Sequence, residues 1–245
     1  MADQHTVGGY DKDLDLLERR IAEMGGLAEK MVIEAVDALA SGDAALAQQV
    51  VETDPRLDML QREIEEQATL TIARRQPVAI DLREIIGAIR VAGDLERVGD
   101  LAKNIAKRSV KIGMEGRAPH AIVGIKHMNE FATELMKDVL DAYAQRDVER
   151  ALDVWERDVD LDALEDSVFR DLLTHMMEDP RNITFCAHLL FCSKNIERIG
   201  DHATNIAETV VYLVTGSTLP TERPRGGQGT DLAAEIAADG NGARG

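Results

Sequence analysis

The chain has 245 residues, of which 45 are acidic and 28 are basic, giving a formal net charge of -17. A field this negative repels nucleic acid and anionic lipid, so we expect no nucleic-acid partner. Aromatic residues make up only 3% of the chain and there are only six prolines, a composition typical of an all-α protein. No apolar run reaches the ~18 residues that a membrane-spanning helix needs, and we expect a cytoplasmic protein.

The apolar periodicity predicts three long helices in the first half of the chain. A heptad pattern over residues 11–41 indicates an amphipathic helix. Asp43 is a suitable N-cap for a second helix, which contains Pro55. A third helix is expected from near Ile80 to about Ile112, and the glycine-rich segment 113–119 is the predicted domain boundary.

The second half repeats this pattern, with a sixth helix expected over residues 183–215. We therefore predict two tandem three-helix bundles, over residues 10–113 and 119–215, followed by a disordered tail over 216–245. Several large or sulfur-containing residues lie in helical apolar patterns and are expected in the core: Trp155, Phe169, Phe185, Phe191 and the two cysteines, Cys186 and Cys192.

One short segment is present twice, 101 residues apart. The copies are Glu96-Arg97-Val98-Gly99-Asp100 and Glu197-Arg198-Ile199-Gly200-Asp201, and both continue to an Asn-Ile-Ala triplet. This agreement indicates an internal duplication. We expect the glycine of each copy to let a neighbouring helix or a ligand approach closely.

Each copy places a Glu and an Asp four residues apart, on the same face of a helix. The second helix of each half offers an aspartate pair at the same spacing. Carboxylate clusters of this kind suit hard metal ions such as Mg²⁺ or Mn²⁺, or oxidised iron. The predicted metal ligands are Asp54, Asp58, Glu96 and Asp100 in the first half, and Asp158, Asp162, Glu197 and Asp201 in the second.

Other interpretations of these residues stay open. Arg97 and Arg198 could neutralise the acidic faces without a metal, which would make the chain a metal-free acidic helical adaptor. His188 and His202 flank the second site but are expected to be polar surface or core residues rather than ligands. Nucleotide-binding, serine-hydrolase and HExxH motifs are absent, so we expect no enzyme; a metal-dependent phosphohydrolase is the least favoured alternative.

The two Glu-Arg-aliphatic-Gly-Asp segments and the two aspartate pairs resemble those of the PhoU family, over about residues 10–215. The resemblance implies tandem three-helix bundles and a metal-binding, negative regulator of phosphate ABC transport and of phosphate-regulon signalling. It also implies clusters of iron, zinc, manganese or magnesium. The implied partners are the ATPase of the phosphate transporter and the sensor histidine kinase of the regulon, with membrane contact only through them. A homodimer is a reasonable assembly.

Overall fold

The computed structural model describes residues 3–78, 80–112 and 119–220, which form six long helices and one short 3₁₀ turn. The helices are α1 (Asp3–Ser41), α2 (Ala44–Arg75), α3 (Ile80–Ile112), α4 (Pro119–Gln145), α5 (Val148–Glu178) and α6 (Ile183–Thr215), with the turn η1 (Pro180–Asn182) before α6. The prediction of an all-α duplicated fold is confirmed. The first helix begins at Asp3, earlier than the predicted start at Asp11.

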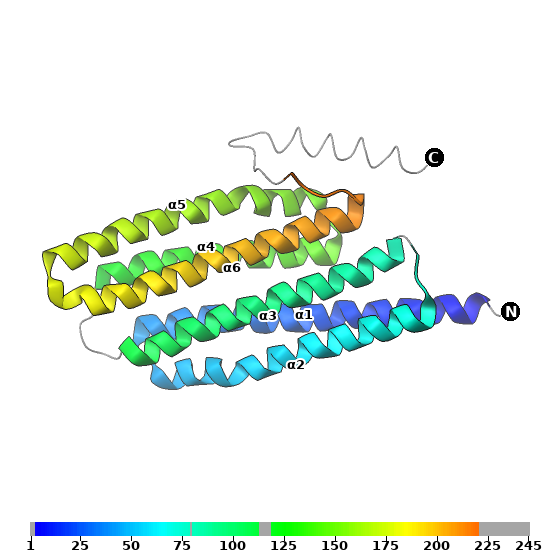
Figure 1. Cartoon of the computed structure of the whole chain (residues 1–245), viewed down its shortest axis with the longest axis horizontal. Helices are drawn as coiled ribbons and strands as arrows, with labels where there is room; N and C mark the ends of the chain where they lie inside the picture. The colour runs from blue at the N-terminus through cyan, green and yellow to red at the C-terminus, as the bar shows by residue number, and fades with distance from the viewer. Residues whose placement is uncertain (1–2, 79, 113–118, 221–245) are drawn as a thin grey trace.

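The six helices form two three-helix bundles whose long axes run alongside one another (Figure 1). Helices α1, α2 and α3 pack together in the first bundle, and α4, α5 and α6 pack together in the second. The bundles join through α3 against α6 and α1 against α4. The third helix of each bundle, which carries the duplicated segment, therefore lies at or near the junction.

Asp43 is the N-cap of α2, as predicted. The Asp43 carboxylate accepts hydrogen bonds from the backbone N–H groups of Ala45 and Leu46, at 2.9 and 3.0 Å. Asp147 caps α5 in the same way, accepting from the N–H of Arg150 at 3.1 Å. Each cap satisfies donors that the first turn of a helix leaves unpaired.

The core consists mainly of aliphatic side chains on the facing stripes of the helices. Trp155 and Phe185 are buried, as predicted, but the prediction was wrong for Phe169 and Phe191, which are 47% and 55% exposed. Phe191 lies beneath the Arg108 guanidinium at 4.0 Å from its ring centroid. Helical periodicity alone did not distinguish an aromatic residue in the core from an aromatic residue that lies on the surface beneath an arginine of a neighbouring helix.

Both cysteines are free and buried. Burial raises the pKa of the Cys192 thiol to about 12, so this thiol stays protonated at neutral pH. No helix in the described part of the chain is apolar over a length that would cross a membrane. Residues 113–118 of the predicted linker 113–119, and the greater part of the predicted tail, 221–245, lie outside the described residues. Pro119, the last residue of the predicted linker, begins α4.

Candidate carboxylate sites

The two duplicated segments lie on α3 and α6, where their glycines permit close helix packing. A Cβ added at Gly99 would come within 2.8 Å of Leu57 Cδ1 on α2. A Cβ added at Gly200 would collide with Leu161 and come within 2.8 Å of Asp158 Oδ1, both on α5. The glycines therefore bring the duplicated segment close to the helix that carries the aspartate pair, as the sequence predicted.

In the first half the predicted carboxylates lie near one another between α2 and α3. Burial, followed by the negative charge of Asp100, raises the pKa of the Glu96 carboxyl above its ordinary value. Smaller increases come from Asp58 and Asp54, and Arg97 acts in the opposite direction. Because each of these charges acts on Glu96, the packing of α2 on α3 places Asp54 and Asp58 near enough to affect the pKa of its carboxyl.

A lysine that the sequence analysis did not single out lies inside this cluster. Lys103 Nζ is 2.6 Å from Asp54 Oδ2 and 2.5 Å from Asp100 Oδ1. Burial is the largest single effect and lowers the pKa of the Lys103 ammonium, but the hydrogen bonds to Asp100 and Asp54, together with their negative charges, raise this pKa above its ordinary value. The signal was present in the sequence, because Lys103 follows Asp100 at the helical i, i+3 spacing.

Arg97 also pairs with the first cluster, from the solvent side. Its guanidinium lies 3.4 Å from Glu96 Oε2 and 3.6 Å from Asp100 Oδ2, and its side chain is 62% exposed. Exposed pairs of this geometry contribute about 0–1 kcal/mol. Arg97 thus has the neutralising position that the sequence suggested, whereas the half-buried Lys103 makes the closer contacts.

In the second half Asp158 is buried between α5 and α6, at 2% exposure. Glu165 joins the acidic group there: burial raises its pKa, and Glu197 and Asp162 add to this increase. Lys194 Nζ lies 2.6 Å from Glu197 Oε1, while Glu197 Oε2 is buried without a hydrogen-bond partner in the described structure. Sequence analysis missed Glu165 and Lys194, both at i, i+3 spacing from a predicted ligand.

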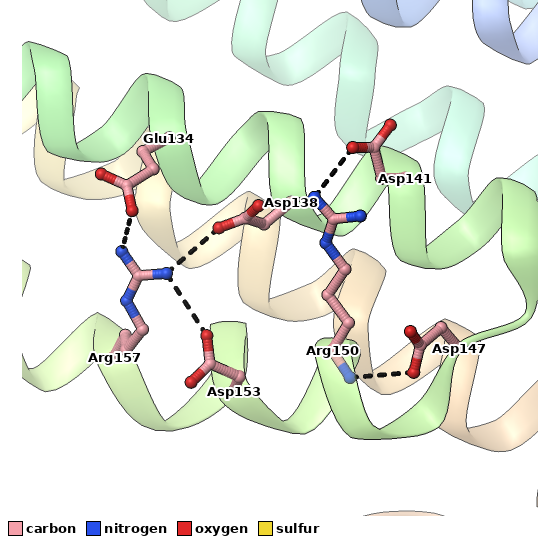
Figure 2. A network of polar contacts seen from close by, with 7 residues as sticks. All are labelled: Glu134, Asp138, Asp141, Asp147, Arg150, Asp153 and Arg157. Atoms are coloured by element: carbon pink, nitrogen blue, oxygen red, sulfur yellow. Dashed lines mark hydrogen bonds and ion pairs between the residues drawn. The ribbon is translucent and has the colours of Figure 1, made fainter.

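Other acidic residues of the second half are paired with arginines. Figure 2 shows α5 joined to α4 by Arg150 and Arg157. Arg150 lies 2.8 Å from both Asp138 and Asp141, and Arg157 lies 2.5 Å from Glu134, 3.1 Å from Asp138 and 3.3 Å from Asp153. Each of these carboxylates is paired with an arginine of α5, and the pairs with residues of α4 join the two helices.

The two histidines make contacts across the bundle junction. His202 Nδ1 is 2.9 Å from Asp94 Oδ1, and Asn205 donates to the same oxygen at 3.2 Å. Arg108 Nη1 is 3.3 Å from His188 Nδ1. Both histidines on α6 therefore connect to α3.

A cavity of ≈ 510 Å³ lies at this junction, beside the first cluster. Its lining comes from α2, α3, α6 and the residues after α6, and it includes Glu96 and Arg97. Arg90, which also lines it, lies 5.3 Å from the centroid of the Tyr212 ring. The lining mixes both signs of charge.

Neither half has a preformed metal site in the described part of the chain. As the side chains stand, no three His, Cys, Asp or Glu residues within 3–78, 80–112 and 119–220 converge on a point that could hold a metal ion. In the first half an ammonium already lies between two of the four predicted ligands. In the second half Lys194 Nζ lies 2.6 Å from Glu197 Oε1, while Glu197 Oε2 is buried without a hydrogen-bond partner among the described residues. The predicted ligands of both halves are carboxylates, which suit hard cations.

The fold and the paired acidic faces define a class of protein: a duplicated bundle with one carboxylate cluster in each half. The family model described as "PhoU domain" matches residues 21–109 and 125–210, once on each bundle. The chain belongs to the PhoU family.

Its relatives agree along nearly the whole chain. It is 55% identical over 225 residues to a phosphate-specific transport system accessory protein PhoU homolog of Rhizobium meliloti, a match covering 92% of this chain and 95% of the relative. It is 46% identical over 222 residues to a protein of the same description from Caulobacter vibrioides, covering 91% and 96%. These relatives are named as accessory proteins, and the chain is accordingly not an enzyme.

Two solved structures share the architecture. The crystal structure of PhoU from Pseudomonas aeruginosa has a TM-score of 0.82 at 40% sequence identity, covering 85% of this chain and all (100%) of that one. The structure of the phosphate transport system regulatory protein PhoU from Streptococcus pneumoniae has a TM-score of 0.80 at 26% identity, covering 86% and 99%. The duplicated bundle is thus the fold of this family.

Proposed function

We propose that this protein acts in the cytoplasm as a negative regulator of phosphate uptake, restraining the phosphate ABC transporter and phosphate-regulon signalling when phosphate is plentiful. The main observation in support is the duplicated acidic face. In each half it lies beside a buried aspartate, Asp54 in the first and Asp158 in the second. Relatives described as accessory proteins of phosphate-specific transport support this assignment. The partners we propose are the transporter ATPase and the sensor histidine kinase, bound by a homodimer.

The test is deletion of the gene in its own organism, followed by growth at high phosphate. We expect phosphate-starvation genes to be expressed under conditions that normally silence them. Complementation with the intact gene should restore silencing. Unchanged expression after deletion would contradict the proposed role.

We further propose that the paired carboxylates hold metal ions that fix the bundle surface recognised by the partners. Asp158, Asp162, Glu197 and Asp201 would hold the ion in the second half, and Asp54, Asp58, Glu96 and Asp100 are the corresponding set in the first. A bound iron, zinc, manganese or magnesium ion would supply positive charge that offsets the repulsion between these carboxylates. The protein's part is to hold the acidic pairs on facing helices.

A second candidate function has one observation in its favour. Lys103 and Arg97 partly neutralise the first cluster with the protein's own cations. This favours a metal-free acidic adaptor, at least for the first half. Elemental analysis of untagged protein separates the two functions: stoichiometric metal supports the regulator with metal clusters, and metal-free protein that still binds its partners supports the adaptor.

A further inference from the structure

One end of the bundle junction has no acidic residue on either of the two helices that meet there. Residues 101–112 of α3 and residues 183–196 of α6 contain no Asp or Glu, although 45 of the 245 residues of the chain are acidic. Arg108 Nη1 lies 3.3 Å from His188 Nδ1, so these two segments lie side by side. A chain with a net charge of -17 thus has two neighbouring stretches without negative charge.

The α3 segment is also rich in basic residues, namely Lys103, Lys107, Arg108 and Lys111. Lys103 is engaged by the carboxylates of the first cluster. Within residues 3–78, 80–112 and 119–220, no carboxylate forms an ion pair with Lys107, Arg108 or Lys111. Lys107 and Lys111 are exposed. Three cations at this end of the junction are therefore without a carboxylate partner in the described structure.

The duplication indicates that the fold does not require these charges. The corresponding residues of α6, 101 positions later, are Thr204, Glu208, Thr209 and Tyr212. The negative end of the helix dipole accounts for a cation in the last turn of α3, where Lys111 lies. It does not account for Lys107 and Arg108, because the effect is confined to the last turn. Helix stability therefore does not explain these two charges.

An exposed aromatic ring lies among the cations. Phe191 of α6 is 55% exposed, and the Arg108 guanidinium lies over its ring, 4.0 Å from the centroid. A guanidinium stacked in this way is held in place and keeps N–H groups at its edge for a carboxylate. Burial, followed by the positive charges of Arg108 and Lys111, lowers the pKa of His188. Positive charge and an apolar ring are thus combined on one surface.

The basic junction surface consists of four residues, Lys107, Arg108, Lys111 and Phe191. We propose that it docks an acidic segment of a partner protein, with carboxylates on the three cations and an apolar side chain on the ring. Charges act over only about 8 Å at physiological salt, so a short segment meets these cations without the acidic faces elsewhere. A nucleic acid or an anionic membrane is larger and would also be repelled by the rest of the chain. The inference rests on the proposed function only for the identity of the partner.

The first experiment uses a model ligand and the full-length protein. A short fluorescent peptide of glutamates with one central leucine is titrated and followed by fluorescence anisotropy. A peptide with glutamine in place of each glutamate is the control. We expect the glutamate peptide to bind at least about tenfold more tightly than the glutamine peptide, and its binding to weaken as NaCl is added. Equal affinity for the two peptides would overturn the proposal.

Charge reversal then locates the binding. The double variant Lys107→Glu with Lys111→Glu is expected to bind the glutamate peptide at least about tenfold more weakly than the wild type. The matched control is Lys126→Glu with Lys137→Glu, two exposed lysines of α4 whose reversal changes the net charge by the same amount. We expect this control to keep nearly all of the affinity. Equal losses in the two double variants would mean that net charge, and not the basic junction surface, governs binding.

The aromatic part of the surface has its own matched pair. Phe191→Ala removes the ring beneath Arg108, and Phe169→Ala removes a ring of similar exposure, 47%, on α5. We expect Phe191→Ala to weaken binding of the glutamate peptide by about threefold or more and Phe169→Ala to leave it unchanged. A Phe191→Ala variant with wild-type affinity would contradict the apolar contact.

The last experiment replaces the peptide with the proposed partners. The purified transporter ATPase and the cytoplasmic part of the sensor kinase are each expected to lose binding to the Lys107 and Lys111 double variant by at least about tenfold. Vesicles of phosphatidylglycerol and phosphatidylcholine are expected not to bind; vesicle binding that the same variant abolishes would overturn the proposal in favour of a membrane contact. Peptide binding through this surface without binding of either protein would refute the proposed partners and support the docking chemistry. Absence of peptide binding would refute the docking surface, while gene deletion still decides the regulatory role.

Discussion

At the scale of single residues, the glycine of each duplicated segment has a role that can be measured. Gly200 allows α6 to lie against Leu161 and Asp158 of α5. We expect Gly200→Ala to destabilise the protein by roughly 1–3 kcal/mol, because the added methyl group has no space. Urea unfolding followed by circular dichroism measures the change.

Gly93 provides the control for this substitution. It also lies in a helix, but a Cβ added there meets nothing within 4 Å. Gly93→Ala is therefore expected to stabilise the protein by about 0.5–1 kcal/mol through helix propensity. If both glycines responded alike, close packing would not explain the presence of Gly200.

Tyr143 gives a second residue-scale prediction, for the pH dependence of stability. Burial is the largest effect and raises the pKa of its phenol to about 12. The folded state therefore disfavours the phenolate, so this contribution to stability is complete below the unfolded pKa of ~10 and is lost as the pH rises through about 12.

Between pH 9 and pH 11 we expect the free energy of unfolding to fall by about 1 kcal/mol more in the wild-type protein than in the Tyr143→Phe variant. Denaturant midpoints at the two pH values measure this difference. A parallel loss in both proteins would show that Tyr143 ionises as readily in the folded state as in the unfolded chain.

At the scale of elements, the loop between α4 and α5 connects the two bundles through Arg146. Its backbone has φ 56°, in the left-handed region, and the equivalent loop of the first half has Gly42 with φ 69°. The Arg146 guanidinium lies 2.7 Å from Glu18 on α1 and 4.7 Å from the centroid of the Tyr143 ring. The arginine thus occupies a position where glycine is favoured and makes contacts that glycine cannot make.

Two substitutions separate the backbone cost from the contacts. Arg146→Ala loses the contacts and keeps the left-handed backbone, so we expect a loss of about 1–2 kcal/mol. Arg146→Gly removes the backbone cost as well and should recover about 1 kcal/mol of this loss. Urea unfolding checks the order of stability, wild type first, then Gly, then Ala; a Gly variant more stable than the wild type would mean that the strain outweighs the contacts.

At the scale of the whole molecule, the two bundles are expected to unfold as a coupled pair because α3 packs closely on α6. A Cβ added at Gly87 on α3 would come within 2.9 Å of Leu213 Cδ1, and the Leu213 side chain is buried. Gly87→Ala should cost roughly 1–3 kcal/mol by overpacking. Leu213→Ala should cost roughly 2–5 kcal/mol by leaving a cavity.

Combining the two substitutions tests the junction directly. The space vacated by Leu213→Ala accommodates the new methyl group at position 87, so the double variant is expected to lose at least about 1 kcal/mol less than the sum of the single losses. Equilibrium unfolding of the four proteins in the cycle measures this coupling. Additive losses would indicate that the bundles do not press together at this point.

The sequence predicted the helices well because long amphipathic helices repeat their apolar residues at short, regular spacing. It placed Glu96 and Asp100 on one face of α3, since residues four apart share a helix face, while their role as metal ligands stays a prediction. It was wrong about Phe169 and Phe191 because the stripe of a helix that faces the core depends on neighbours distant in sequence. It missed Lys103 as a member of the first cluster because its contact with Asp54 exists only after α2 packs on α3.

The sequence by itself determined the duplication, the six helices and the pairing of carboxylates, because each follows from spacing along the chain. The tertiary structure decided which charges meet in each cluster. Local spacing puts Lys103 near Asp100, but only the approach of α2, permitted by Gly99, brings the ammonium between Asp100 and Asp54. The two duplicated segments are nearly equal in sequence but have different electrostatic surroundings. The Lys103 ammonium on α3 contacts Asp54 on α2, and this contact between helices is what distinguishes the first segment.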